Sequence, residues 1–192
     1  MKATISTIKN CRECLLYKNQ TPLLDTSENT NVFWVGLSAV KVKDTNTSKP
    51  LDANTRTGML IEQIEEQIGG VSFYRTNLVK CFPESVGKIR YPTQKEMSCC
   101  FPNLVSELNN LSPKVVVLLG KQVADYVFKH YGKNSYSLNN CFSYEAYKVD
   151  GVSFIPVHHP SYILIYHRRN LNKYVDEISN IINENLNSNY EK

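Results

Sequence analysis

Short apolar segments rich in β-branched and aromatic residues alternate along the chain with segments whose apolar residues recur at helical spacing. Segments of the first kind are short and bounded by turn residues, which is typical of strands buried on both faces. Three of them are predicted as core strands, at residues 31–36, 73–79 and 114–120. Residues 142–149 and 152–157 flank Asp150 and Gly151, which predicts a hairpin whose second arm is another core strand.

The segments between these strands predict helices that cover the sheet. A first helix ends at Gly69, because glycine readily adopts the backbone conformation that terminates a helix. Thr93 and Glu96 form a capping box that opens a second helix. Two more helices are expected, one after residue 120 and one from about Asn170. Strands that alternate with helices predict an α/β fold, a three-layer α/β/α sandwich around a mainly parallel four-stranded central sheet.

Composition excludes several classes of protein. The chain has 192 residues, of which 42% are hydrophobic and 21% charged, so it is neither disordered, collagenous nor a disulfide scaffold. No repeat or linker divides it, and we expect one domain over residues 1–192, with a Cys-x-x-Cys segment at the N-terminus and an acidic helical C-terminal tail. No signal peptide or membrane-length apolar run is found, which predicts a cytoplasmic protein without membrane contact.

The charge distribution permits a polyanionic partner. The formal net charge of the chain is +4. Residues 170–192 have a net charge of −2, so residues 1–169 have a net charge of +6. A basic body of this kind is compatible with nucleic acid without requiring it.

The six cysteines need an explanation other than disulfides, because thiols stay reduced in the cytoplasm. Cys11 and Cys14 form a Cys-x-x-Cys pair before the first strand, and Cys81 ends the second strand. Cys99 and Cys100 lie in the capped helix, and Cys141, near the hairpin, is read as a small buried apolar residue. Four thiolates bind either zinc or an iron–sulfur cluster, and spacing does not separate these two from each other or exclude scattered core cysteines.

Polar residues follow several of the predicted strands. Gly36, Asn77, His158 and His159 all lie where a strand ends. The carboxyl ends of parallel strands meet at one edge of the sheet, where ligands bind in such folds. We therefore expect these strand ends to converge on a binding site, with His158 filling space at the end of its strand rather than binding the ligand.

Four segments in this order, together with the leading Cys-x-x-Cys, resemble one family. They are Val35-Gly36, Thr76-Asn-Leu-Val-Lys-Cys81, Lys114-Val-Val-Val-Leu-Leu-Gly120 and His159-Pro-Ser-Tyr162. Over about residues 11–180 the chain is similar to the iron–sulfur branches of the uracil-DNA glycosylase superfamily, families four and five.

This resemblance implies a [4Fe–4S] cluster held by Cys11, Cys14, Cys81 and Cys100, with zinc as the alternative. Glu96 and Pro102 frame Cys100 as in the family pattern. Helical geometry agrees, because Cys99 points about 100° away from Cys100 and is expected to be a bystander. The cluster would have a structural role, holding its segments together beside the DNA-binding surface.

The resemblance also implies the catalytic residues of a DNA glycosylase. A glycosylase takes its base out of the stack, reads the base edge and stabilises the departing anion. Asn77 would read uracil, because one carboxamide can donate to O4 and accept from N3–H. His159 would donate to O2, where negative charge grows as the bond breaks. No lysine occupies a motif position that would suggest lyase chemistry.

The first loop and the turn after the last strand complete the expected site. Gly36, Leu37 and Ser38 would line the base pocket, and Leu51 would cover the base in place of the family's stacking aromatic residue. Asp52 is the preferred acidic residue of this loop, with Asp44 as the other candidate; either would orient water or stabilise the oxocarbenium-like sugar. DNA contacts are expected from Ser161, Tyr162, Arg168 and Arg169.

The sequence therefore predicts a monofunctional, monomeric enzyme of base-excision repair that removes uracil, or a related deaminated base, from single- or double-stranded DNA. Three alternatives stay open: a glycosylase for another base, such as hypoxanthine or a hypermodified pyrimidine; a catalytically silent iron–sulfur nucleic-acid-binding module; and a zinc-stapled α/β protein. Leu37 and Leu51 favour the first of these, because they depart from family four.

Overall fold

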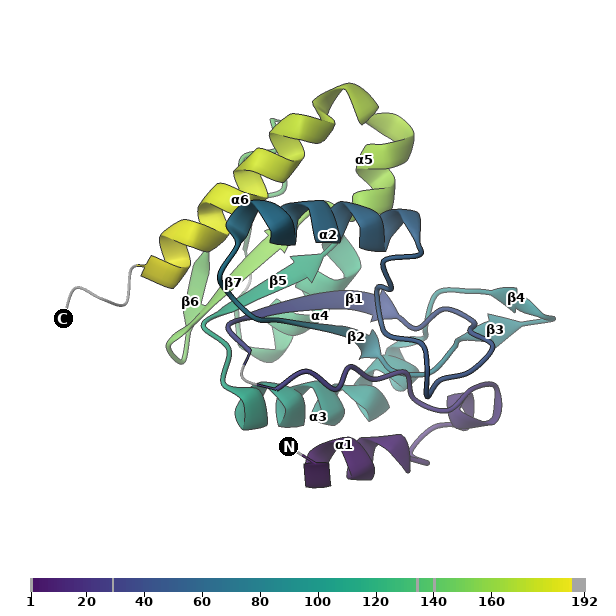
Figure 1. The fold of residues 1–192 in the computed structure, drawn as a ribbon. Helices are drawn as coiled ribbons and strands as arrows, with labels where there is room; N and C mark the ends of the chain where they lie inside the picture. The colour runs from purple at the N-terminus through teal and green to yellow at the C-terminus, as the bar shows by residue number, and fades with distance from the viewer. Residues whose placement is uncertain (1, 29, 134, 140, 188–192) are drawn as a thin grey trace.

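The computed structural model describes residues 2–28, 30–133, 135–139 and 141–187 and is built around one five-stranded sheet in the order β2-β1-β5-β7-β6 (Figure 1). β1 (Val32–Ser38), β2 (Phe73–Val79), β5 (Val115–Leu119) and β7 (Val152–Val157) run parallel. β6 (Tyr147–Val149) adds an antiparallel edge to β7. The prediction of a mainly parallel sheet is confirmed, and its four strands become five because the first arm of the hairpin also pairs.

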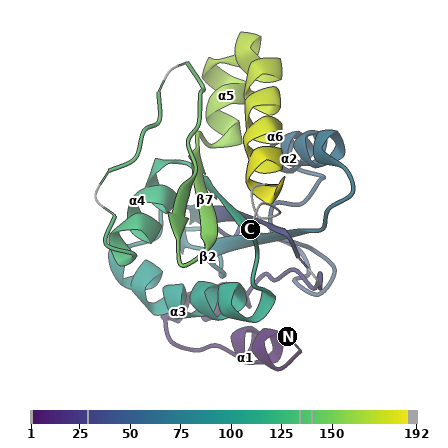
Figure 2. The same ribbon diagram turned by 90° about the vertical axis from the view of Figure 1, so that its left-hand side faces the viewer.

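Helices cover both faces of this sheet (Figures 1 and 2). α3 (Gln94–Leu111) and α4 (Lys121–His130) lie on one face, with α1 (Lys2–Lys9) outside α3. α2 (Arg56–Ile68), α5 (Pro160–Tyr166) and α6 (Leu171–Asn187) lie on the other. The predicted α/β/α sandwich is therefore confirmed.

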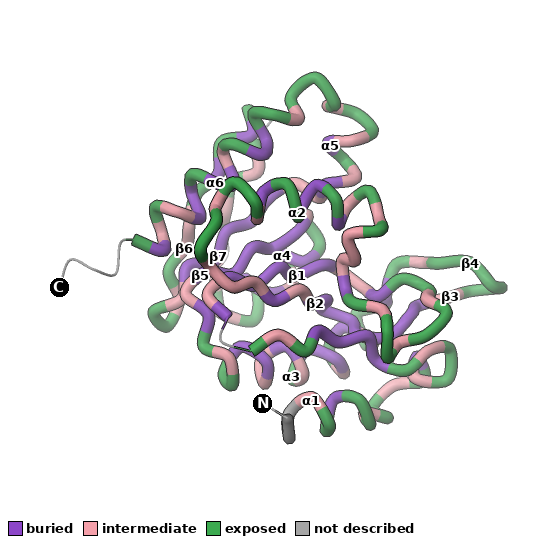
Figure 3. The backbone as a smooth tube through the Cα atoms, in the orientation of Figure 1, coloured by how far each residue is buried: buried purple, intermediate pink, exposed green. Residues whose placement is uncertain are grey.

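The core lies on both sides of the sheet. In β1, Phe33 and Val35 face the side of α3 and α4, while Val32 and Trp34 face α2 and α6. All four side chains are fully buried, which explains why the strand reads as an unbroken apolar run. Figure 3 shows the buried strands in the centre and exposed positions on the outer faces of the helices.

The capping box of α3 is present and is joined to a small hairpin. Thr93 Oγ1 accepts from the Glu96 N–H at 3.2 Å, and the Glu96 carboxylate accepts from the Thr93 N–H at 2.8 Å. Arg90 binds the same carboxylate through two nitrogens, at 2.6 and 2.8 Å, and lowers the pKa of Glu96 to about 2. This ion pair fixes the hairpin of β3 (Glu84–Ser85) and β4 (Lys88–Ile89) to the start of α3.

Several short elements were not predicted from the sequence: α1, α5, the β3–β4 hairpin and two 3₁₀ helices, η1 (Leu15–Lys18) and η2 (Arg168–Asn170). Within the described ranges, none of the helices has the length and apolar character needed to cross a bilayer. Of the expected acidic tail, Glu191 and Lys192 lie outside the described residues.

Candidate functional site

A cleft of about 850 Å³ opens at the carboxyl ends of the parallel strands. The structure brings nine of the eleven expected substrate and DNA residues to its wall: Gly36, Leu37, Ser38, Leu51, Asp52, Asn77, His159, Ser161 and Tyr162. They come from β1, β2, the segment after β7, α5 and the loop before α2, so the cleft depends on several separate parts of the fold.

Asn77 lies deep in this cleft, next to Gly36 on the neighbouring strand. The two residues are register partners, and a Cβ added at Gly36 would collide with the Oδ1 atom of Asn77. The absence of a side chain at Gly36 therefore makes room for the carboxamide. Within the part of the chain that the structure describes, this carboxamide makes no hydrogen bond, although the residue is only 3% exposed. Its donor and acceptor are free to bind a ligand.

His159 precedes α5 and is held in one tautomer by that helix. Its Nδ1 accepts a hydrogen bond from the Ser161 backbone N–H at 3.2 Å and lies 2.8 Å from the Ser161 hydroxyl. A backbone N–H can only donate, so Nδ1 carries no proton and the neutral ring bears its hydrogen on Nε2. Burial lowers the pKa of His159 below the ordinary 6.5, which favours this neutral donor form.

The lowered pKa of His159 predicts that the free energy of unfolding decreases as the solution becomes mildly acidic. As the pH falls below 6.5, the unfolded chain takes up a proton first, so folding weakens until the pH reaches the lower pKa of the folded state. We expect His159→Gln to show a shallower loss of melting temperature between pH 7.5 and 5 than the unsubstituted protein. Because burial also lowers the pKa of His158, the melting temperature of the variant should still fall somewhat with decreasing pH. Equal slopes in the two proteins would contradict a depressed His159 pKa.

Asp52 reaches the cleft from the loop between β1 and α2. Hydrogen bonds to its Oδ1 from the backbone and side chain of Asn54, both 2.8 Å, lower its pKa and keep it a carboxylate. The preceding Leu51 has a φ of +52°, unusual for this residue type, and its carbonyl accepts from Arg75 at 2.9 Å. Arg75 is in turn paired with Glu65 of α2 at 2.6 Å. The acidic loop is thus held by both β2 and α2.

Gly58, in the first turn of α2, sets how closely this loop can approach the helix. A Cβ there would overlap the carbonyl group of Asp52 and lie 2.6 Å from the carbonyl oxygen of Leu51. We expect Gly58→Ala to push the loop outward and to lower the free energy of unfolding by about 1–3 kcal/mol, measured by urea denaturation. Met59→Ala, at an exposed position of the same turn, is the control and should change little. A Gly58→Ala protein as stable as the control would show that the loop is not constrained here.

Three expected candidates lie away from the cleft wall. Arg168 and Arg169 form η2 after α5 and are exposed, so any contact with DNA would be outside the cleft. Asp44, the alternative acidic residue, is an exposed turn residue that accepts from the Asn46 backbone at 2.8 Å. Of the two acidic candidates, Asp52 lines the cleft and Asp44 does not.

Further cleft residues were missed by sequence reasoning. Ile89, Arg90 and Tyr91 of the β3–β4 hairpin line one side, and Ile165 and Tyr166 of α5 lie at its edge as well. All but Arg90 are large apolar side chains that are more than half exposed, and this exposure follows from tertiary packing, which leaves no local signal in the sequence.

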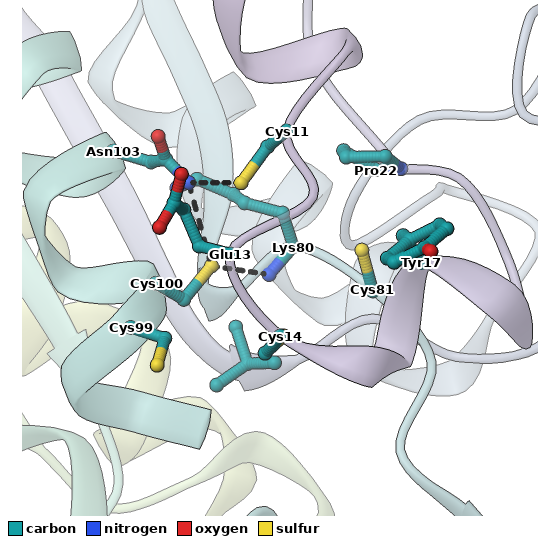
Figure 4. A pocket seen from close by; sticks show the side chains of 11 residues that line it. Cys11, Glu13, Cys14, Tyr17, Pro22, Lys80, Cys81, Cys99, Cys100 and Asn103 are labelled. Atoms are coloured by element: carbon teal, nitrogen blue, oxygen red, sulfur yellow. Dashed lines mark hydrogen bonds between the residues drawn. The ribbon is translucent and has the colours of Figure 1, made fainter. Parts of the chain in front are cut away.

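A second, smaller pocket is lined by five cysteines from three parts of the chain (Figure 4). Cys11 and Cys14 come from the N-terminal segment, Cys81 follows β2, and Cys99 and Cys100 belong to α3. The Asn103 side-chain nitrogen lies 3.7 Å from the Cys11 sulfur and 3.8 Å from the Cys100 sulfur, and the Lys80 N–H donates to Cys100 at 3.3 Å.

The chemistry of this donor set fits an iron–sulfur cluster. Burial first, and then the neighbouring thiols, raise the pKa of Cys81 to about 12, so a positively charged centre is needed to keep thiolates here. In the described ranges, no group of three or more His, Cys, Asp or Glu residues is arranged to hold a metal ion. Four thiolates suit either a zinc ion or an iron–sulfur cluster, in which each thiolate binds its own iron.

The two remaining cysteines lie in different surroundings. Cys99, expected to be a bystander, also lines the pocket, although Figure 4 shows its sulfur pointing away from that of Cys100. The burial predicted for Cys141 is wrong: this residue is exposed, because the neighbouring Phe142 fills the core instead and is only 1% exposed.

Comparisons with known proteins point to one family. The family model described as the uracil DNA glycosylase superfamily matches residues 20–182, which leaves Cys11 and Cys14 outside the match. A type-4 uracil-DNA glycosylase of Thermotoga maritima is 29% identical over 168 residues, covering 85% of this chain and 83% of the relative. One of Sulfurisphaera tokodaii is 27% identical over 176 residues, covering 88% and 76%. The crystal structure of wild-type SMUG2 of Pedobacter heparinus has a similar fold, with a TM-score of 0.57 and 12% identity over 81% of this chain and 76% of that one.

Proposed function

The chain belongs to the uracil DNA glycosylase superfamily, and from this membership we propose that it hydrolyses the N-glycosidic bond of uracil in DNA and leaves an abasic site for base-excision repair. The observation that carries the proposal is the meeting of Asn77 and His159 in one cleft. They come from the ends of two different strands, and each offers a hydrogen-bonding edge that nothing else described in the chain uses.

Base recognition is assigned to Asn77. Its carboxamide can donate to O4 of uracil and accept from N3–H at the same time, a pattern that cytosine does not match. Gly36 leaves the space for this side chain, and Leu51, which lies 3.2 Å from where a Gly36 Cβ would be, covers the same region. Leu37 and Ser38 line the cleft beside them.

Bond cleavage is assigned to His159 and Asp52. The neutral His159 ring would donate from Nε2 to O2 of uracil, where negative charge develops, as a donor in an oxyanion hole does. The Asp52 carboxylate would orient the attacking water or stabilise the positive charge on the sugar. Both groups are in the needed form near neutral pH, because the pKa of each is lowered.

The cleft rim is proposed to hold the DNA strand. Ser161 and Tyr162 of α5 lie on it, as do Gly120 and Lys121 at the start of α4, where no side chain caps the first backbone N–H groups. Arg168 and Arg169 follow α5 and could contact phosphates farther along the strand.

We further propose that Cys11, Cys14, Cys81 and Cys100 hold a [4Fe–4S] cluster. Such a cluster would supply no step of the hydrolysis but would join the N-terminal segment, the end of β2 and α3. The proposal is supported by the five thiols around one pocket and by the sulfur-only character of the expected ligands.

The function is tested with oligonucleotides that carry uracil, hypoxanthine or xanthine, single-stranded and paired. After incubation with the protein, alkali should cleave the uracil strand at the abasic site. Lys121 also lines the cleft but is paired with Asp125 at 3.0 Å, so we expect no strand cleavage before alkali. Release of hypoxanthine instead of uracil would favour the alternative base, and DNA binding without release would favour a silent binding module.

A further inference from the structure

A buried ion pair lies directly behind Asn77 and takes no part in the chemistry proposed above. Lys80, just beyond β2, and Glu107 of α3 meet at 2.6 Å, and their side chains are 1% and 2% exposed. Neither lines the base cleft. A buried pair of this kind is weak evidence for stability, because apolar replacements are often as stable, so its position invites a functional explanation.

The ammonium group of Lys80 is fully used by three acceptors. Besides Glu107, it donates at 2.7 Å to the Thr76 hydroxyl and at 2.7 Å to the backbone carbonyl of Asn77. An ammonium group has three hydrogens, and each of them has one of these acceptors, so the position of the Lys80 nitrogen is fixed from three directions. One of the three bonds holds the residue assigned to read the base.

Glu107 fixes Lys80 in turn. Its Oε2 accepts from Lys80 and, at 3.0 Å, from Thr76, while its Oε1 accepts from the Tyr74 hydroxyl at 3.1 Å. Tyr74, Thr76 and Asn77 all belong to β2, so the carboxylate ties α3 to the same strand that presents the base-reading amide.

Lys80 also reaches the cysteine pocket through its backbone. Its N–H donates to the Cys100 sulfur at 3.3 Å, and Cys81 is the next residue along the chain. The side chain of one residue therefore contacts the base-reading strand while its backbone contacts an expected cluster ligand.

We propose that Lys80, held by Glu107, is a positioning residue that fixes the Asn77 backbone for base recognition and joins it to the Cys100 side of the cysteine pocket. This role rests on the proposed function. It requires that the Asn77 carboxamide be held within a fraction of an ångström, since small misplacements of a recognition group are costly in rate.

The experiment removes the bond to Asn77 without leaving a buried charge. Lys80→Met alone would leave the Glu107 carboxylate buried without its cation, so the variant tested is Lys80→Met with Glu107→Gln. The glutamine oxygen can still accept from the Tyr74 hydroxyl, and its NH2 group can donate to the Thr76 hydroxyl. We expect a thermal midpoint and iron content close to those of the unsubstituted protein and unchanged affinity for the oligonucleotide. The single-turnover rate of uracil release should fall by about 10- to 100-fold.

Two further variants separate positioning from a general structural effect. Tyr74→Phe removes a hydrogen bond of the same network that touches neither Lys80 nor Asn77, and it should keep its rate. Combined with Asn77→Ala, the Lys80/Glu107 double substitution should slow release no further, because both act through one amide. A double variant with the original rate, or an effect that adds in full to Asn77→Ala, would overturn the proposal. If the unsubstituted protein released no uracil, the proposed function itself would fail.

Discussion

Replacing His159 by alanine is expected to slow uracil release by about 100- to 1000-fold, the range found when a donor is removed from an oxyanion hole. The loss follows from the geometry: Ser161 occupies Nδ1, so Nε2 is the only ring atom left to donate to O2. The effect should appear in the single-turnover rate with oligonucleotide binding largely kept, because the interaction strengthens as charge develops.

The adjacent histidine supplies a matched control. His158 does not line the cleft; its Nδ1 lies 3.1 Å from the Tyr144 hydroxyl, and its ring is stacked on Tyr162. His158→Ala should keep most of the rate. His159→Asn separates capping from catalysis, because asparagine can still cap α5 but cannot place a donor where Nε2 lies. Wild-type rates in both His159 variants would remove this residue from the mechanism.

The sequence was sufficient for the four parallel strands of the sheet and for several residues at their carboxyl ends. The prediction for residues 114–120 contains β5, because a strand buried on both faces leaves a continuous apolar run in the sequence. Gly36, Asn77 and His159 could be brought together in advance because parallel strands present their carboxyl ends at one edge.

Other features depend on contacts between distant residues and left no local signal. Gly58 is needed because of the carbonyl of Asp52, and Glu107 acts on a lysine 27 positions earlier in the chain. The β3–β4 hairpin was missed because each strand has only two residues and its turn places Val86 at a φ of +51°, where glycine or asparagine is usual. Burial of Cys141 was mispredicted because only packing decides which of two adjacent side chains enters the core.

The neighbouring cysteines of α3 allow the cluster to be tested by substitution. Cys100 is 7% exposed and is contacted by both Lys80 and Asn103, whereas the sulfur of Cys99 points away from that of Cys100. If the cluster is bound as proposed, the purified protein should absorb at about 400 nm and contain about four irons and four sulfides per chain. A colourless protein with one zinc would contradict this.

Cys100→Ala should lose this absorbance and nearly all of its iron, while Cys99→Ala should keep both, although the two positions differ by a single residue. The cluster would join three segments that are otherwise held by ordinary packing, so Cys100→Ala should also unfold at a lower temperature and be cleaved by protease near the N-terminal segment. If Cys100→Ala is insoluble, removal of iron from the native protein by a chelator gives the same comparison. Loss of iron from Cys99→Ala with retention in Cys100→Ala would make Cys99 the fourth ligand, because both residues line the pocket and only one can complete the set.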